Sequence, residues 1–143
     1  YISRDSYVGV ATVAEMFMAL YNDDLNEMLR LLQTYLLTIP QCDNTNYEGH
    51  YQQMLYVIFS LLGRYVDVEV RTPKGRVDMV MNSGKALYLF ELKLNKSAEA
   101  AMNQINLKDY PSRFALAGLP VIKVGINFNS ETHTIEDWVI DDK

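Results

Sequence analysis

The sequence has almost no cysteine and no long apolar run. Cys42 is the single cysteine among 143 residues, so the chain cannot form an internal disulfide, and no cysteine cluster offers a zinc site. No apolar segment approaches the ~18–20 residues of a membrane span, and the N-terminus lacks the basic and then apolar pattern of a signal peptide. These absences predict a cytoplasmic protein without a membrane partner.

An excess of basic residues is also missing. The net charge of −5 argues against a protein that coats nucleic acid through a uniformly basic surface. The imbalance lies in residues 1–50, which contain seven acidic and two basic residues, whereas residues 64–123 contain ten basic and six acidic ones. The second region has the locally basic character that a phosphate-handling site needs, although an ordinary mixed surface has the same composition.

Length and composition predict one folded core. Hydrophobic residues make up 49% of the chain and charged residues 22%, as in a globular domain rather than a disordered one. The sequence opens on Tyr1 rather than on methionine, so we expect an N-terminal neighbour in a longer chain. A polar loop at residues 40–46 divides the sequence. We expect residues 1–46 to form a helical connector segment and residues 47–143 to form the functional domain.

The apolar residues recur first at helical spacing and then, after Gly63, with the period of two that is typical of half-buried strands. A later passage of strand, helix and strand favours a right-handed crossover, which makes those two strands parallel. We therefore expect an α/β fold, a mixed sheet with an α-β-β-β-α-β core that a helical segment precedes. The predicted helices cover residues 12–21, 24–37, 47–61 and 97–108, and the predicted strands cover residues 66–71, 76–81, 86–92, 121–128 and 134–140.

The register of the second and third strands decides whether Asp78 and Glu91 act together. A two-residue turn and a four-residue turn both place Met81 opposite Ala86 and Asp78 opposite Leu89. Because opposed residues share a face and alternate residues along a strand do too, Asp78 and Glu91 become diagonal neighbours on one face. Diagonal neighbours lie about 7–8 Å apart at the backbone, which lets two carboxylates bind one cation.

Lys93 continues the same face of the third strand, which also carries Leu87 and Leu89. Two carboxylates at the end of an apolar surface would repel each other and lose hydration. A divalent cation with oxygen ligands, Mg²⁺ or Mn²⁺, relieves both problems. The alternative is a structural α/β domain in which Glu91 and Lys93 form an ion pair.

Glu69 adds a third carboxylate to this face if the turn at residues 72–75 has four residues, because that turn places Glu69 opposite Asp78. An ion pair of Glu69 with Arg71 or Arg76 explains the same residue equally well.

The run GRVDMVMNSGKALYLFELK, with Glu48 on a preceding helix and Gln104 on a following one, resembles the PD-(D/E)XK nuclease superfamily. More narrowly, it is similar to bacterial nuclease-like domains of Bacteroides-type genomes that follow an ATPase-like domain. The resemblance covers residues 47–143. The E-x-K motif alone has little specificity. The match becomes specific through the ordered set of helix glutamate, strand aspartate, hairpin, E-x-K and helix glutamine. Val77 stands where the superfamily name has proline, and many members lack that proline.

The resemblance implies a restriction-endonuclease-like fold and a role for each matching residue. Lys93 matches the motif lysine, which orients or activates the attacking water and offsets charge on the phosphate. Gln104 matches a helix glutamine that a subset of the superfamily carries. The implied metal ligands are Asp78, Glu91, the Leu92 carbonyl and Glu48.

The implied function is Mg²⁺-dependent hydrolysis of nucleic-acid phosphodiester bonds, with DNA as the expected substrate and an ATPase-like domain as the N-terminal neighbour. Arg71, Lys74 and Arg76 flank the first turn and are candidates for contacts with a nucleic-acid backbone, although a solvated turn has the same composition. The alternative function is a catalytically silent module that binds nucleic acid or protein beside the ATPase-like domain.

Overall fold

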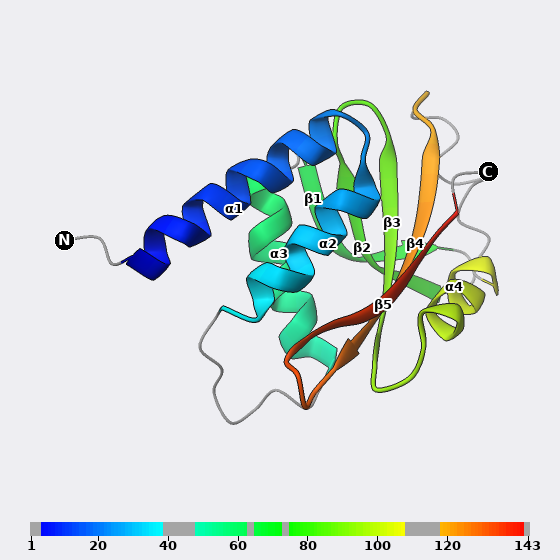
Figure 1. Cartoon of the computed structure of the whole chain (residues 1–143). Coiled ribbons are helices and arrows are strands. Elements are labelled where there is room, and N and C mark those ends of the chain that lie inside the picture. Colours follow the sequence, from blue (N-terminus) through cyan, green and yellow to red (C-terminus); the bar gives the residue numbers. More distant parts are fainter. Residues whose placement is uncertain (1–3, 39–47, 63–64, 73–74, 108–117, 142–143) are drawn as a thin grey trace.

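The computed structural model describes residues 4–38, 48–62, 65–72, 75–107 and 118–141, and it shows a sheet with helices on both faces (Figure 1). The helices of the described residues are α1 (Arg4–Tyr21), α2 (Leu25–Leu36), α3 (Glu48–Leu62) and α4 (Ala98–Leu107). The strands are β1 (Tyr65–Thr72), β2 (Gly75–Asn82), β3 (Leu87–Leu94), β4 (Val121–Asn129) and β5 (Thr134–Asp141).

The five strands form one mixed sheet in the order β1-β2-β3-β4-β5. The pairs β1–β2, β2–β3 and β4–β5 are antiparallel, whereas β3 and β4 are parallel. The parallel pair is the one that α4 connects, because a chain that leaves one end of β3 must return to the other end before β4. The α/β class, the mixed sheet and the parallel pair that the sequence predicts are therefore confirmed.

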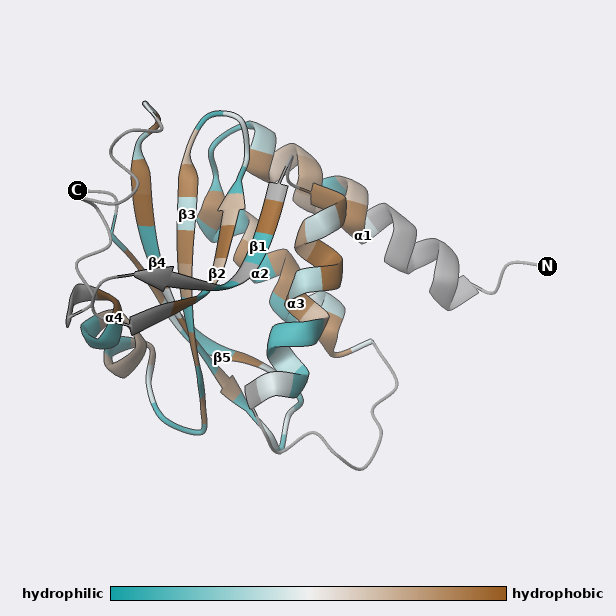
Figure 2. Cartoon of the chain, turned by 180° about the vertical axis from the view of Figure 1, so that it is seen from behind, coloured by the Kyte–Doolittle hydropathy of each residue, from teal (hydrophilic) through white to brown (hydrophobic). Residues whose placement is uncertain are grey.

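Two separate clusters of buried side chains lie on the two faces of the sheet. The larger cluster joins α1, α2 and α3 to one face and includes Met16, Leu32, Tyr51 and Phe90. The smaller cluster joins α4 to the other face; its members are Val77, Val80, Leu87, Leu89 and Ile105. The view from behind shows α4 away from the three other helices, and it shows β3 as apolar along most of its length (Figure 2). β3 is buried on both faces and is the central strand.

The helices of the first segment pack on the sheet through α2. Asp24 caps this helix, since its carboxylate accepts the Glu27 N–H at 3.1 Å. Gln33 contacts β5 twice, because its side-chain Nε2 donates to the Ile135 carbonyl at 2.7 Å and its main-chain carbonyl accepts the Thr134 hydroxyl at 2.6 Å. α1 starts at Arg4, earlier than the expected residue 12, despite Gly9, whose helix propensity is low.

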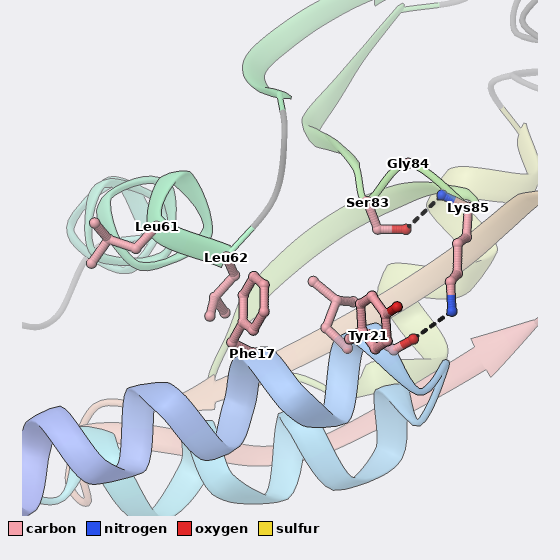
Figure 3. Close-up of a pocket in the computed structure, with 8 residues that line it drawn as sticks. Phe17, Tyr21, Leu61, Leu62, Ser83, Gly84 and Lys85 are labelled. Carbon is pink, nitrogen blue, oxygen red and sulfur yellow. Dashed lines mark hydrogen bonds between the residues drawn. The ribbon is translucent and has the colours of Figure 1, made fainter.

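The end of α1 is joined to the turn between β2 and β3 (Figure 3). The Lys85 ammonium donates to the Tyr21 carbonyl at 2.6 Å and lies 4.5 Å from the centre of the Tyr21 ring. A cation there satisfies a carbonyl at the negative end of the helix dipole. Beside this contact lies a pocket that Phe17, Leu61 and Leu62 line.

None of the helices in the described part of the chain is both long and apolar enough to cross a membrane.

Gly125 on β4 allows α4 to approach the sheet closely. A Cβ atom at this position would lie 2.6 Å from the Ala98 carbonyl oxygen and 2.8 Å from the Met102 backbone nitrogen. Both obstructing atoms belong to the helix backbone, so a side chain here displaces α4 as a whole. We predict that Gly125→Ala lowers the free energy of unfolding by about 1–3 kcal/mol, the usual cost of overpacking. Urea unfolding measures it, and a change within about 0.5 kcal/mol, as for surface substitutions, would contradict the close approach.

Candidate active site

The turn between β2 and β3 sets a register that differs from the expected one. Met81 pairs with Tyr88 and Asn82 with Leu87, so the predicted opposition of Met81 and Ala86 is wrong by two residues. Ala86 closes the turn instead of beginning the strand, because its carbonyl accepts the Ser83 N–H at 3.1 Å. The Asn82 side chain also accepts the Gly84 N–H at 2.7 Å, an Asx-turn contact that the composition did not reveal.

This correction changes which residue of β3 corresponds to Asp78. A shift of two residues leaves the paired side chains of Met79 to Asn82 on their expected faces, since the side-chain period of a strand is two. The ladder ends at Met79 and Phe90, and its register continues to Asp78 opposite Glu91. In the observed register Asp78 therefore corresponds to Glu91, one position beyond the ladder, where the sequence predicts Leu89.

Side chains replace the backbone ladder at the point where β2 separates from β3. The Leu92 N–H donates to Asp78 Oδ2 at 2.7 Å, and Gln52 Nε2 of α3 donates to the Asp78 carbonyl at 2.9 Å. Val77 belongs to the cluster under α4, whereas Met79 belongs to the cluster under α3, so β2 twists at Asp78. Asp78 is thus held through its carboxylate and its main chain at this fork of β2 and β3.

Glu91 is buried in the sheet, with 1% of its surface exposed. Its neighbour on β4 is Gly125, whose close contact with α4 places both residues on the face that this helix covers. A buried carboxylate is costly unless a cation or hydrogen-bond donors stabilise its charge. Lys93 follows two residues later on the same face and is half-buried. Among the residues that the structure describes, no ion pair joins Glu91 to Lys93, which disfavours the structural alternative.

Asn127 lies opposite Lys93 on β4 and fixes the chain that follows the E-x-K segment. Its Oδ1 accepts the Lys96 N–H at 2.9 Å, and its Nδ2 lies 3.1 Å both from the Lys96 carbonyl and from Asp137 Oδ1. Asp137 in turn accepts the Ala98 N–H at 3.2 Å, at the first residue of α4. Sequence reasoning missed this residue, and the available signal was a single amide inside the apolar strand VIKVGINF.

We predict that Asn127→Ala destabilises the protein by about 2–3 kcal/mol, because Asn127 is 1% exposed and its loss leaves the Lys96 backbone groups without their partner. Urea unfolding of Asn127→Ala and of Asn103→Ala measures the effect. Asn103 is an exposed amide on α4 and should change stability by less than about 0.5 kcal/mol. Equal stability of the two variants would contradict the role assigned to Asn127.

Two further predicted site residues lie on helices next to the fork. Glu48 is the first residue of α3, one helical turn before Gln52, and its side chain lies outside the described part. Gln104 is half-buried on α4, three residues after Ala101. Residues three apart share one side of a helix, and Ala101 packs near Gly125, the neighbour of Glu91. α4 thus turns towards β4 the side that carries Gln104.

The remaining candidates lie on the β1–β2 hairpin. Glu69 lies in register with Asp78, between two paired residues, as the sequence predicts. Its side chain is exposed and its φ is 52°, an unusual backbone conformation for glutamate. Arg71 and Arg76 pair across the ladder near its end, where their side chains are not described, and Lys74 lies outside the described residues.

The donors at the fork fit a hard cation. Asp78 and Glu91 supply carboxylates and Leu92 supplies a carbonyl, which are the oxygen ligands that Mg²⁺ prefers. Within the described ranges, no group of three or more histidine, cysteine, aspartate or glutamate side chains is placed to hold a metal ion. Mg²⁺ requires only one or two protein carboxylates, because water and substrate phosphate complete its shell. The residues present fit Mg²⁺ better than zinc, whose protein sites are built mainly from cysteine sulfur and histidine nitrogen.

Comparison with known proteins supports this interpretation. Residues 46–138 match the model of a family described as the PD-(D/E)XK nuclease superfamily. The chain is also 27% identical over 134 residues to a protein of Azotobacter chroococcum mcd 1 named "Uncharacterized protein in vnfD 5'region". That alignment covers 89% of this chain but 26% of the relative, so the chain spans about a quarter of the relative's length. No solved structure matches the chain.

Proposed function

Since the chain belongs to the PD-(D/E)XK nuclease superfamily, we propose that it hydrolyses phosphodiester bonds of nucleic acid in a reaction that depends on Mg²⁺ or Mn²⁺. The observation that carries this proposal is the fork of β2 and β3, where Asp78 is anchored by Leu92 and Gln52 in register with the buried Glu91. Two carboxylates held in register at one point of the sheet offer oxygen ligands to a divalent cation.

Each residue at the fork has a distinct proposed role. Asp78, Glu91 and the Leu92 carbonyl hold the cation, and Glu48 completes the site from the first turn of α3. When bound, the ion lowers the pKa of a coordinated water and offsets charge on the phosphate. Lys93 orients the attacking water and places its ammonium beside the scissile phosphate. Gln104 on α4 lines the same side of the site.

The wider setting is part of the proposal. DNA is the proposed substrate, and Arg71, Lys74 and Arg76 contact its backbone near the tip of the β1–β2 hairpin. We also propose a cytoplasmic location and a longer natural chain in which an ATPase-like domain of the Bacteroides-type architecture precedes this domain. The length of the Azotobacter relative is consistent with such a chain, because the match covers only 26% of it.

A second candidate function is a binding or regulatory module that does not cleave nucleic acid. The observation in its favour is the net charge of −5, which weakens attraction to a phosphate backbone. Under this alternative the fork still binds a cation or a phosphate, but hydrolysis does not follow.

Cleavage assays separate the two functions. End-labelled single-stranded, duplex and branched DNA, and single-stranded RNA, are incubated with the protein in Mg²⁺, in Mn²⁺ or in a chelator. The nuclease hypothesis predicts shortened products that need the metal. Calorimetric titration of Mg²⁺ into the protein measures the site without substrate. Heat of binding without cleavage of any substrate would support the silent module, and absence of both would contradict the metal site.

A further inference from the structure

We infer that Gln52 is a positioning residue of the metal site, which holds the main chain of Asp78 in place from α3. This inference rests on the proposed function. Gln52 Nε2 donates to the Asp78 carbonyl at 2.9 Å, and this is a contact between residues 26 positions apart in the chain. No motif of the sequence pointed to Gln52, because a glutamine one turn into an amphipathic helix resembles an ordinary polar residue.

The contact matters because of where it lies. The last pair of the β2–β3 ladder is Met79 with Phe90, so Asp78 is the first residue of β2 beyond the ladder. Its carboxylate accepts the Leu92 N–H, and its carbonyl is held by Gln52. These two hydrogen bonds locate both the backbone and the side chain of the proposed ligand. Loss of the second removes this anchor from the Asp78 main chain, and the nearest ladder pairs that remain are those of Val77 and Met79 with β1.

α3 is a rigid support for this donor. Tyr51 and Leu55, which flank Gln52 on the helix, are fully buried in the core. The Tyr51 ring stacks on Phe128 of β4 with 4.6 Å between the ring centres, so the start of α3 packs against the end of β4. Gln52 therefore donates its hydrogen bond to Asp78 from a fixed place on the helix. It also lies one turn after Glu48, so the same contact sets the distance between this first turn and the fork.

Small displacements of Asp78 are expected to weaken Mg²⁺ binding. Mg²⁺ demands near-ideal octahedral geometry with ligands at about 2.0–2.1 Å, and it tolerates misplacement less well than Ca²⁺. Residues that orient metal ligands through hydrogen bonds typically contribute about 10–100-fold to metal affinity or activity. We assign Gln52 to this class, with the difference that it orients the ligand through the main chain.

The test compares Gln52→Leu with Gln53→Leu. Gln53 is the adjacent glutamine on α3 and is exposed, so its substitution controls for the loss of an amide from this helix. Calorimetry with Mg²⁺ should show an affinity at least about tenfold weaker for Gln52→Leu and unchanged for Gln53→Leu. In cleavage assays the Gln52→Leu defect should shrink as the Mg²⁺ concentration rises, because the added ion compensates for the weaker site.

A second variant keeps the inference testable if Gln52→Leu folds poorly. Gln52→Met retains the length of the side chain and adds no charge but lacks the amide donor, and it should weaken Mg²⁺ binding in the same way. Unchanged Mg²⁺ affinity of the folded Gln52 variants, with only their stability lowered, would overturn the positioning role. Wild-type protein that binds no Mg²⁺ would overturn the proposed metal site itself, a result that is distinct from the first.

Discussion

Asp78→Asn is expected to reduce metal-dependent cleavage about a thousandfold while the protein stays folded, because loss of a bound Mg²⁺ that lowers the activation barrier by about 4 kcal/mol has this effect on the rate. Asparagine keeps an oxygen that can accept the Leu92 N–H, so the hydrogen bond at the fork survives. What is lost is the negative charge, which a hard divalent cation requires. Mg²⁺ titration by calorimetry and single-turnover cleavage on the best substrate measure the two consequences.

The matched control is Glu99→Gln, which also converts a carboxylate to an amide but on the exposed surface of α4. It should leave both Mg²⁺ affinity and cleavage within about twofold of the wild type, a difference of less than about 0.5 kcal/mol, as expected of surface substitutions. Equal cleavage by wild type and Asp78→Asn would show that Asp78 is not a metal ligand, and the proposed mechanism would fail with it.

Lys93→Met is expected to reduce cleavage about 10²–10³-fold, the usual effect of removing one group that stabilises developing charge. Mg²⁺ affinity should remain the same or rise slightly, because the substitution removes a positive charge near the proposed cation. Methionine retains much of the apolar stem that a half-buried lysine packs against its surroundings. The loss should therefore appear in the rate of the chemical step and not in the stability of the fold.

Lys96→Met is the control for this substitution, since Lys96 is exposed three residues later. Its backbone is held by Asn127, so the side chain can be changed without disturbing the end of β3. Comparable loss of cleavage in both lysine variants would point to a general effect of positive charge on nucleic-acid binding. Salt dependence distinguishes that case, because binding through phosphate contacts weakens steeply as salt rises.

The two substitutions together separate binding of the metal from turnover. The nuclease hypothesis predicts that Asp78→Asn loses both, whereas Lys93→Met loses turnover alone. A silent module predicts that neither variant changes cleavage, since none occurs in the wild type, and that Asp78→Asn weakens Mg²⁺ binding whereas Lys93→Met does not.

The sequence by itself determined the order of the elements and the faces of the strands. The change of side-chain period after Gly63 and the passage of strand, helix and strand predicted the strands and the parallel pair, because side-chain period and the order of the elements can be read along the chain. The side-chain period of two also made the prediction that Asp78 and Glu91 share a face independent of an even shift in register. The actual register differs from the predicted one by two residues, and a shift by an even number keeps the same side chains on the same face.

Only the tertiary structure decided how these residues are held. The turn closed by Ser83 and Ala86 set the register and placed Asp78 in register with Glu91. Gln52 and Asn127 were not predicted, because each acts through a backbone group of a residue at least 26 positions away in the chain. The closeness of α4 to Gly125 depends likewise on how a helix settles on the sheet. Such contacts depend on distances between segments, and the period of a sequence carries information only about the directions of its side chains.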